Sequence, residues 1–212
     1  NYSIKEKGVH NPVTDADITA NDIIYNILSK KFPDYGFLSE ETKDSSNRLD
    51  KEFVWVIDPL DGTKEFIEGI PHFVVSIGLV KNGKPIVGVL YNPVSKELFY
   101  AEYKKGAYYN HNLIQCSNKN KFSNVSIVVS RSEIKAGLWI NYQDVFNRTN
   151  EIGSVAYKLG LVAANKYDFF VTLKPKNEWD ICAGQIILSE AGGILVNSKS
   201  YNEPIYNQKK TL

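Results

Sequence analysis

The sequence is poor in cysteine and histidine and contains no methionine. Its two cysteines, Cys116 and Cys182, are too few for a disulfide framework and lack the spacing of a metal site. The three histidines, His10, His72 and His111, stand apart in polar segments, so we expect surface positions and no zinc centre. Because an initiator methionine is also missing, we expect the 212 residues to be part of a longer chain.

Long apolar runs and an excess of one charge are absent as well. No apolar stretch approaches the roughly 20 residues of a membrane-spanning helix, and 25 basic residues balance 24 acidic ones. The net charge of +1 gives no field that would draw the molecule onto a nucleic acid polymer or an anionic membrane. We therefore expect a cytoplasmic protein without a transmembrane segment, or one held peripherally at the inner membrane. Dinucleotide and P-loop sequences are also missing, which leaves those functions without support.

The apolar pattern that is present indicates two regions of mixed helix and strand. Helical spacing after Thr14 is followed by alternating stretches with turn signals between them, which is typical of an antiparallel meander. Across a polar boundary segment at 117–124, we expect an N-terminal α+β region over residues 1–122 and a smaller C-terminal α/β region over 123–212. The expected strands cover 53–57, 73–81, 85–91, 98–103, 127–129 and 168–173, the later helices 155–164 and 180–191, and a polar loop 44–51.

Acidic side chains stand at the ends of several apolar segments, where a lone one is commonly a helix cap or part of a solvated turn. One segment, Asp58-Pro59-Leu60-Asp61-Gly62-Thr63, indicates more. Pro59 fixes the chain after Asp58, and the turn directs both carboxylates and the Leu60 carbonyl at one small volume. Hard oxygens at that spacing suit Mg²⁺. The glycine that follows frees backbone amides for a phosphate group.

Four motifs stand in order along the chain. They are Pro12-Val13-Thr14-Asp15-Ala16-Asp17, Leu38-Ser39-Glu40-Glu41, the segment from Asp58 to Thr63, and Trp179-Asp180 followed by Glu190-Ala191-Gly192-Gly193. With these motifs the chain resembles the lithium-sensitive, Mg²⁺-dependent phosphatase superfamily that includes inositol monophosphatases and 3'(2'),5'-bisphosphate nucleotidases. The resemblance implies a layered αβαβα sandwich of the inositol monophosphatase type, with an antiparallel sheet region followed by a smaller α/β region. It allows a monomer or a homodimer.

Within this superfamily the chain is most similar to the CysQ type of bisphosphate nucleotidase. The similarity lies in Ser39-Glu40-Glu41, Lys64-Glu65-Phe66, Ser130-Arg131-Ser132 and Lys158. Val155 departs from the pattern, because the nucleotidases often carry a serine three residues before this lysine.

The resemblance implies roles for particular residues and a cofactor of two to three Mg²⁺ ions. One ion would be held by Glu40, Asp58 and the Leu60 carbonyl, and a second by Asp58, Asp61 and Asp180. A third, weaker ion would use Glu40. Thr63, oriented by Asp17, would take the proton of the attacking water as a general-base pair. The implied substrate contacts are Gly62, Thr63, Arg131, Lys158 and Asp180.

The implied activity is removal of the 3'-phosphate from adenosine 3',5'-bisphosphate or its sulfated relative, which would serve sulfur metabolism. Lys158 is the expected partner of the second phosphate, since a polyol monophosphate has no second dianion to pair. Two alternatives stay open: an inositol or sugar monophosphatase with the same metal site, and an inactive homologue that binds a nucleotide or a metal. A purely structural role for the acids predicts that Asp61→Asn leaves metal affinity unchanged.

Overall fold

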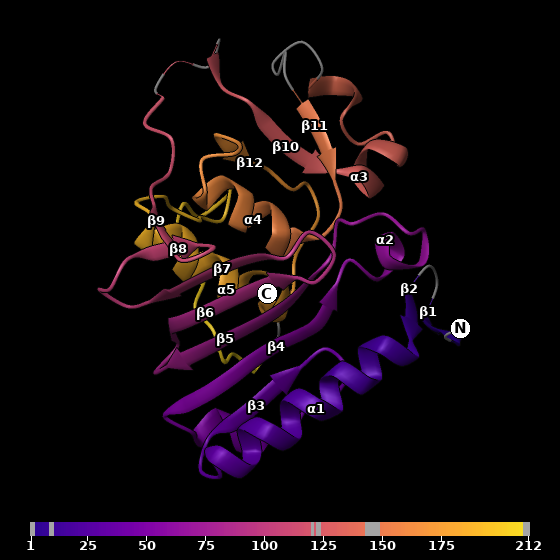
Figure 1. Ribbon diagram of the computed structural model, residues 1–212, viewed down its shortest axis with the longest axis vertical. Helices are drawn as coiled ribbons and strands as arrows, with labels where there is room; N and C mark the ends of the chain where they lie inside the picture. Colours follow the sequence, from indigo (N-terminus) through magenta and orange to yellow (C-terminus); the bar gives the residue numbers. More distant parts are fainter. Residues whose placement is uncertain (1–2, 9–10, 120, 122–123, 143–148, 210–212) are drawn as a thin grey trace.

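A seven-stranded mixed sheet forms the centre of the protein (Figure 1). The computed structural model describes residues 3–8, 11–119, 121, 124–142 and 149–209. The first two strands of this sheet are parallel and every later pair is antiparallel, which confirms the predicted meander. In spatial order the strands are β3 (Gly36–Ser39), β4 (Phe53–Asp61), β5 (Val74–Lys81), β6 (Lys84–Asn92), β7 (Glu97–Glu102), β8 (Ala107–Tyr109) and β9 (Asn112–Ile114).

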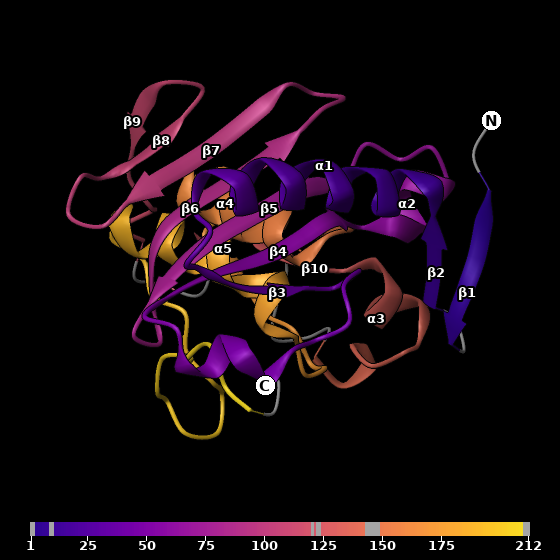
Figure 2. The same cartoon turned by 90° about the horizontal axis from the view of Figure 1, so that it is seen from below.

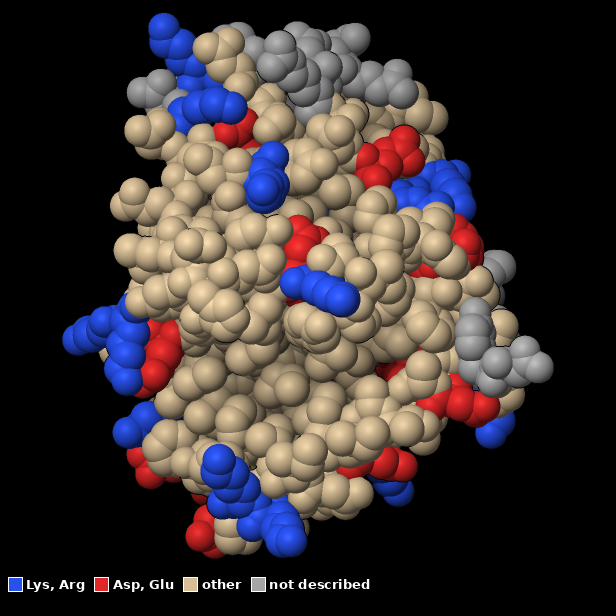
Figure 3. All heavy atoms as spheres, in the orientation of Figure 1, with Lys and Arg blue, Asp and Glu red and all other residues tan. Residues whose placement is uncertain are grey.

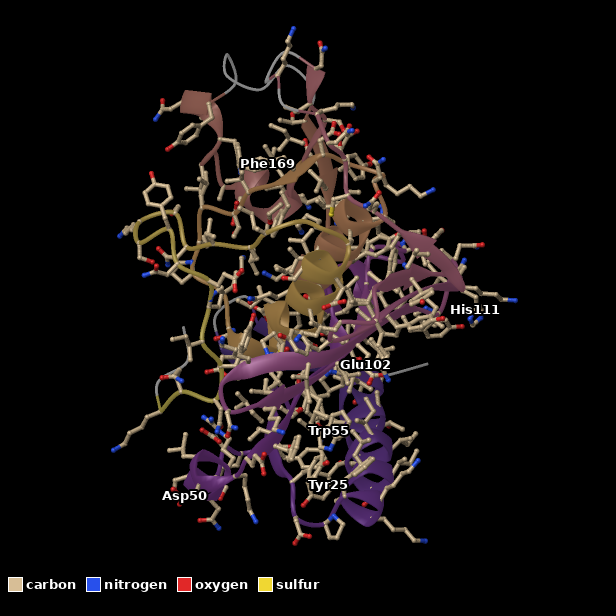
Figure 4. The ribbon with its side chains drawn as sticks, turned by 90° about the vertical axis from the view of Figure 1, so that its left-hand side faces the viewer. Tyr25, Asp50, Trp55, Glu102, His111 and Phe169 are labelled. Carbon is tan, nitrogen blue, oxygen red and sulfur yellow. The ribbon has the colours of Figure 1, made fainter. Side chains whose placement is uncertain are left out.

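Helix α1 (Asp15–Lys31) lies on one face of this sheet, as its apolar spacing predicts. It begins with a capping box, in which the Asp17 carboxylate accepts a hydrogen bond of 2.8 Å from the Thr14 backbone amide. Its apolar side chains pack around Trp55, which is only 8% exposed. Figure 4 shows Tyr25 and Trp55 in the layer of side chains between helix and sheet.

Helices α4 (Val155–Ala163) and α5 (Glu178–Glu190) lie on the opposite side of the large sheet (Figure 2). Helix α5 crosses β5 and β6, and α4 packs beside it. The close approach depends on glycine, because a Cβ atom at Gly88 would lie 2.5 Å from the carbonyl oxygen of Ala183. One apolar core joins both helices to the sheet.

A smaller parallel sheet packs against α4 and completes the layers. Its strands are β11 (Thr149–Ile152), β10 (Ile127–Ser130) and β12 (Phe169–Phe170), in that order. Helix α3 (Arg131–Lys135) and Trp139 cover its outer face. The succession helix, sheet, helix, sheet, helix confirms the predicted αβαβα sandwich.

The remaining described elements are short and lie around the two sheets. They are the hairpin β1 (Ile4–Gly8) with β2 (Asn11–Thr14), helix α2 (Thr63–Ile67), and the 3-10 helices η1 (Ser46–Asp50) and η3 (Ile140–Tyr142). No helix in the described part of the chain is both long and apolar enough to cross a membrane. The predicted division of the chain at residues 117–124 stays a prediction.

Three predicted elements are wrong in extent. Strand β4 continues to Asp61 where a stop at Ile57 is expected, and its pairing with β5 is irregular between Asp58 and Asp61. Pro59 lies in that irregular stretch and has no amide hydrogen for the ladder. The expected polar loop at 44–51 contains η1, because the guanidinium of Arg48 is buried and bonded there.

The third is the strand predicted over 168–173, of which only β12 forms. After Phe170 the chain leaves the sheet, because Thr172 and Leu173 form hydrogen bonds with the Glu133 side chain instead of with a neighbouring strand. The Glu133 carboxylate accepts a hydrogen bond of 2.6 Å from the Thr172 hydroxyl and one of 3.1 Å from the Leu173 amide.

Candidate active site

Three carboxylates from distant parts of the chain converge at one end of the large sheet. Asp58 and Asp61 come from the end of β4, and Asp180 comes from the first turn of α5. One oxygen atom of each lies within 4.8 Å of the others. They line a pocket of about 280 Å³, together with Pro12, Glu40, Leu60, Gly62, Thr63, Lys64, Glu65, Ser130, Ser132, Gly153, Ser154, Val155, Lys158 and Lys176.

The backbone after Asp58 turns tightly to bring these groups together. The Leu60 amide donates a hydrogen bond of 3.0 Å to Asp58 Oδ1, which closes the turn around Pro59. Gly62 then adopts a φ of 106°, in the left-handed region that favours glycine. A side chain there would also collide with the chain, since a Cβ would lie 2.7 Å from the carbonyl oxygen of His72.

Burial and mutual repulsion make the acidic cluster costly in its charged form. Burial raises the pKa of Asp58 well above its ordinary value, and the surrounding carboxylates raise it further. Burial also raises the pKa of Asp180 to about 7, with Asp61 as the second cause. A set of converging carboxylate oxygens that repel one another fits a hard divalent cation such as Mg²⁺, because the cation's charge removes the repulsion. The donor set of this pocket therefore suits the metal implied by the sequence.

A hydroxyl and a carboxylate form a dyad at the edge of the acidic cluster. The Thr63 hydroxyl lies 2.9 Å from Asp17 Oδ1, to which it donates, and 3.2 Å from the Leu60 carbonyl oxygen. The second oxygen of Asp17 accepts hydrogen bonds from the amide and the hydroxyl of Thr14, at 2.8 and 2.6 Å. The capping box that begins α1 therefore also fixes the carboxylate that orients Thr63.

The two cations predicted as substrate contacts are both engaged within the protein. Lys158 is 1% exposed, and its ammonium donates to the carbonyl oxygens of three consecutive residues, 152–154, at 3.0, 3.2 and 2.6 Å. Burial lowers the pKa of Lys158 to about 8, while the nearby Asp61 opposes this shift. The guanidinium of Arg131 donates to Glu65 at 2.9 Å and to Glu68 at 2.8 Å. Their substrate roles stay predictions.

The structure brings to the pocket two further residues, Ser154 and Glu65, to which the sequence assigned no role. Ser154 donates a hydrogen bond of 2.7 Å to Asp61 Oδ2, and the Ala156 amide donates to the same oxygen at 2.6 Å. Glu65 is 9% exposed and lines the pocket. A serine followed by an apolar helix signals an N-cap, but nothing in that pattern says which carboxylate the hydroxyl meets.

The prediction that the histidines lie at the surface is wrong for His72. This side chain is partly buried, and its Nδ1 atom is enclosed with no hydrogen-bond partner among the residues that the structure describes. The short segment from α2 to β5 folds its ring toward Tyr157, with ring centroids 6.2 Å apart. His111 is exposed between β8 and β9, as predicted (Figure 4), and His10 lies outside the described residues.

A larger hollow of about 500 Å³ lies over β6, β7 and β8, away from the carboxylates. Its walls are mainly apolar, including Val87, Val89 and Leu98, and the stacked rings of Tyr100 and Tyr108 contribute to it. Glu102 is the one carboxylate among its lining residues, whereas a divalent cation needs several converging oxygen ligands. On the face of the molecule shown in Figure 3, basic and acidic side chains are interspersed, in keeping with the net charge of +1.

The layered fold and the acidic pocket define a class of metal-dependent phosphatases, and comparison with known proteins identifies the family. The family model described as the inositol monophosphatase family matches residues 1–211. The chain therefore belongs to the inositol monophosphatase family and is a Mg²⁺-dependent phosphomonoesterase of that kind.

Individual relatives agree with this membership. The chain is 35% identical to inositol monophosphatase 2 from Solanum lycopersicum, covering 92% of this chain and 77% of the relative. It is 36% identical to a fructose-1,6-bisphosphatase/inositol-1-monophosphatase from Aquifex aeolicus, covering 91% and 74%. The solved structure of the extragenic suppressor protein suhB from Bartonella henselae matches with a TM-score of 0.82 at 35% identity, covering 92% and 76%. The CysQ-type nucleotidase subtype stays a prediction.

Proposed function

We propose that the protein hydrolyses the phosphate monoester of a small polyol, an inositol or sugar monophosphate. The observation that carries the proposal is the convergence of Asp58, Asp61 and Asp180 in a pocket whose wall includes the Thr63 hydroxyl. The relative named inositol monophosphatase 2 supports the same class of substrate, and the one named fructose-1,6-bisphosphatase/inositol-1-monophosphatase supports, more broadly, a phosphate ester of a sugar or polyol.

Two overlapping groups of oxygen ligands would hold the cations. The first is Glu40, Asp58 and the Leu60 carbonyl, and the second is Asp58, Asp61 and Asp180. Bound Mg²⁺ supplies charge neutralisation on the phosphate oxygens and a lowered pKa for water. The number of ions, two or three, stays a prediction.

The dyad of Thr63 and Asp17 would prepare the attacking water. Because the Thr63 hydrogen is directed at Asp17 Oδ1, the lone pairs of Thr63 Oγ1 are free to accept a hydrogen bond from water. As the water attacks phosphorus, its proton would pass to Thr63 Oγ1 while the Thr63 proton passes to Asp17. Gly62 and Thr63 line the pocket, and their backbone amides would hold the phosphate.

The hydrogen bonds of Lys158 and Arg131 within the protein support a monophosphate substrate. A second phosphate needs a free cationic donor, and an ammonium group has three hydrogens to donate. Lys158 directs its ammonium at three carbonyl oxygens, and Arg131 is paired with two carboxylates. A neutral polyol makes no such demand.

A 3'(2'),5'-bisphosphate nucleotidase is the second candidate, favoured by two other lysines. Lys64, which is exposed, and Lys176 both line the pocket beside the carboxylates. Lys176 Nζ lies 3.7 Å from Glu133, a long ion pair that a phosphate group can replace. These side chains offer the positive charge that a second phosphate requires.

The test measures phosphate release from inositol 1-phosphate and from adenosine 3',5'-bisphosphate side by side, with and without Mg²⁺. Wild type, Asp61→Asn and the double variant Lys64→Ala/Lys176→Ala are compared. We expect wild type to prefer inositol 1-phosphate, to require Mg²⁺ and to lose activity in Asp61→Asn. The double variant should retain the inositol phosphatase activity.

Preference for the bisphosphate, lost in the double lysine variant, would replace the proposed substrate with the second candidate and keep the metal site. Release from neither substrate by wild type would contradict both and favour the inactive binding homologue. If Asp61→Asn bound Mg²⁺ with unchanged affinity, Asp61 would have a purely structural role.

A further inference from the structure

Lys158 is a fully buried lysine whose hydrogen-bonding capacity is used up inside the protein. It lies in helix α4 at 1% exposure, and its side chain turns back toward the segment that precedes the helix. Its Nζ atom donates to the carbonyl oxygens of Ile152, Gly153 and Ser154 at 3.0, 3.2 and 2.6 Å. An ammonium group has three hydrogens, so these bonds leave none for a ligand.

The segment held by Lys158 is a tight turn under conformational strain. Ser154 has a φ of 54°, a left-handed conformation that costs a residue with a side chain about 1 kcal/mol or more. Gly153 is pressed against Glu65 on its other side, since a Cβ there would lie 2.2 Å from the Glu65 carboxyl carbon. The turn is thus confined between Lys158 and Glu65.

This turn orients Asp61. Ser154 Oγ and the Ala156 amide both donate to Asp61 Oδ2, at 2.7 and 2.6 Å, and Ser154 Oγ also accepts from the Tyr157 amide at 3.0 Å. One oxygen of Asp61 is therefore occupied twice, which leaves the other oxygen for a cation shared with the neighbouring carboxylates. The orientation depends on the unusual backbone of Ser154, and Lys158 holds that backbone.

We infer that Lys158 is a positioning residue of the metal centre: it fixes the 152–154 turn and, through Ser154 and Ala156, the Asp61 carboxylate. The inference rests on the proposed role of Asp61 as a metal ligand. It assigns Lys158 to cation affinity, whereas the resemblance to nucleotidases assigns it to substrate. Groups that orient a metal ligand without touching the metal commonly change metal affinity by about 10- to 100-fold when they are removed.

The test is the affinity of chelator-treated protein for Mn²⁺ and Mg²⁺, measured by titration calorimetry. Lys158→Met keeps the length of the side chain and removes its donors, and we expect it to weaken cation binding by about tenfold or more. Ser154→Ala should weaken binding similarly. Because both changes interrupt one connection, the double variant should bind little more weakly than either single variant. Val162→Ala, a buried change in the same helix, is the matched control for lost stability and should keep wild-type affinity.

A second measurement separates positioning from substrate contact. At saturating Mg²⁺, Lys158→Met should retain nearly the wild-type KM for the phosphate ester, because the lysine donates nothing to the ligand. Unchanged cation affinity in Lys158→Met, with a raised KM, would overturn the inference. Strictly additive effects of the two single changes would overturn it too.

If Lys158→Met does not fold, Ser154→Ala decides, and a wild-type cation affinity in that variant overturns the inference. Failure of wild type to bind a divalent cation would overturn the proposed metal centre and the role of Lys158 together. Equal, tight binding by wild type and Lys158→Met would overturn the role of Lys158 alone.

Discussion

The acidic and basic sides of the pocket differ in how the protein treats their charges. Burial and repulsion raise the pKa of both Asp58 and Asp180, so these carboxylates are held together against their electrostatic preference. In contrast, hydrogen bonds from Arg131 to Glu68 and Glu65 help raise the pKa of that guanidinium and hold its charge in place. The carboxylates are arranged to receive positive charge from outside, whereas Arg131 and Lys158 already have partners within the protein.

The number of charges near a pocket is therefore a poor guide to the ligand that the pocket binds. What matters is whether a charge still has unused bonding capacity directed at the cavity. By that criterion the carboxylates of the pocket attract cations. Lys158 and Arg131 instead bind groups of the protein itself, the carbonyl oxygens of residues 152–154 and the carboxylates of Glu65 and Glu68.

Removing one acidic charge should have the largest effect. We expect Asp58→Asn to lower kcat/KM on the order of 10³-fold, because the proposed shared cation ligand would lose its charge and keep its size. Without Mg²⁺ the same change should raise Tm near neutral pH, since a buried charge is gone. The control is Asp50→Asn, at an exposed acid in η1 (Figure 4), which should change neither quantity. Wild-type turnover by Asp58→Asn would contradict the claim that the buried carboxylates bind the cation needed for activity.

Thr63→Ala tests the dyad without altering a charge. We expect kcat to fall about 100-fold, because the attacking water loses the group that orients it and takes its proton. Thr63→Ser keeps the hydroxyl and should recover most of the activity. Mg²⁺ affinity, measured by calorimetry, should be the same in all three proteins. A KM effect without a kcat effect would show that Thr63 binds substrate only.

The raised carboxyl pKa values predict an unusual pH dependence of the metal-free protein. The pKa of Asp180 rises from an ordinary 3.8 to about 7 on folding, so its contribution to stability is complete below the lower value. That contribution is lost as the pH rises through the higher value, because the folded state must then hold a buried charge. In a chelating buffer we expect Tm to fall by roughly 5 °C between about pH 5 and about pH 8.

Adding Mg²⁺ should abolish this fall, because the cation stabilises the ionised carboxylates. The matched protein is Asp58→Asn, in which the fall in the chelating buffer should be smaller. A metal-free Tm that rises over the same interval would contradict the upward shift of these carboxyl pKa values.

Arg131→Ala should have the smallest effect. Its guanidinium, whose side chain is 17% exposed, bridges Glu65 and Glu68. We expect the free energy of unfolding, measured by denaturant titration, to fall by about 1 kcal/mol, as for a partly exposed ion pair. KM should stay close to wild type with either phosphate substrate. A large rise in KM for the bisphosphate alone would show that Arg131 leaves its carboxylate partners to bind substrate.

The layered fold was predicted from the resemblance to a phosphatase superfamily, whereas most of the grouping of the acids was predicted for a local reason. Asp58, Leu60, Asp61 and Thr63 lie in one short segment whose proline and glycine restrict the backbone, so their proximity follows from the chain itself. Asp180 joined them only through the resemblance to a phosphatase superfamily. The structure places it at the start of α5, with a carboxylate oxygen within 4.8 Å of those of Asp58 and Asp61, and its role as a metal ligand stays a prediction.

The direction of Lys158 could not be predicted from the pattern, because it depends on contacts distant from any motif. A lysine in an apolar helix is expected to extend toward solvent or a ligand. Here its ammonium group donates hydrogen bonds to three carbonyl oxygens of a strained turn. The shape of that turn depends on the positive φ of Ser154. The burial of His72 has the same kind of cause, a loop that packs its ring toward Tyr157.

The most direct test of the central claim is a calorimetric titration of Mg²⁺ into chelator-treated protein at neutral pH. Two buffers with different ionisation enthalpies reveal whether protons leave the protein on binding. Because the pKa of Asp58 and that of Asp180 are raised, we predict that binding releases protons and that Asp58→Asn binds much more weakly. Binding without proton release and with equal affinity in Asp58→Asn would contradict the account.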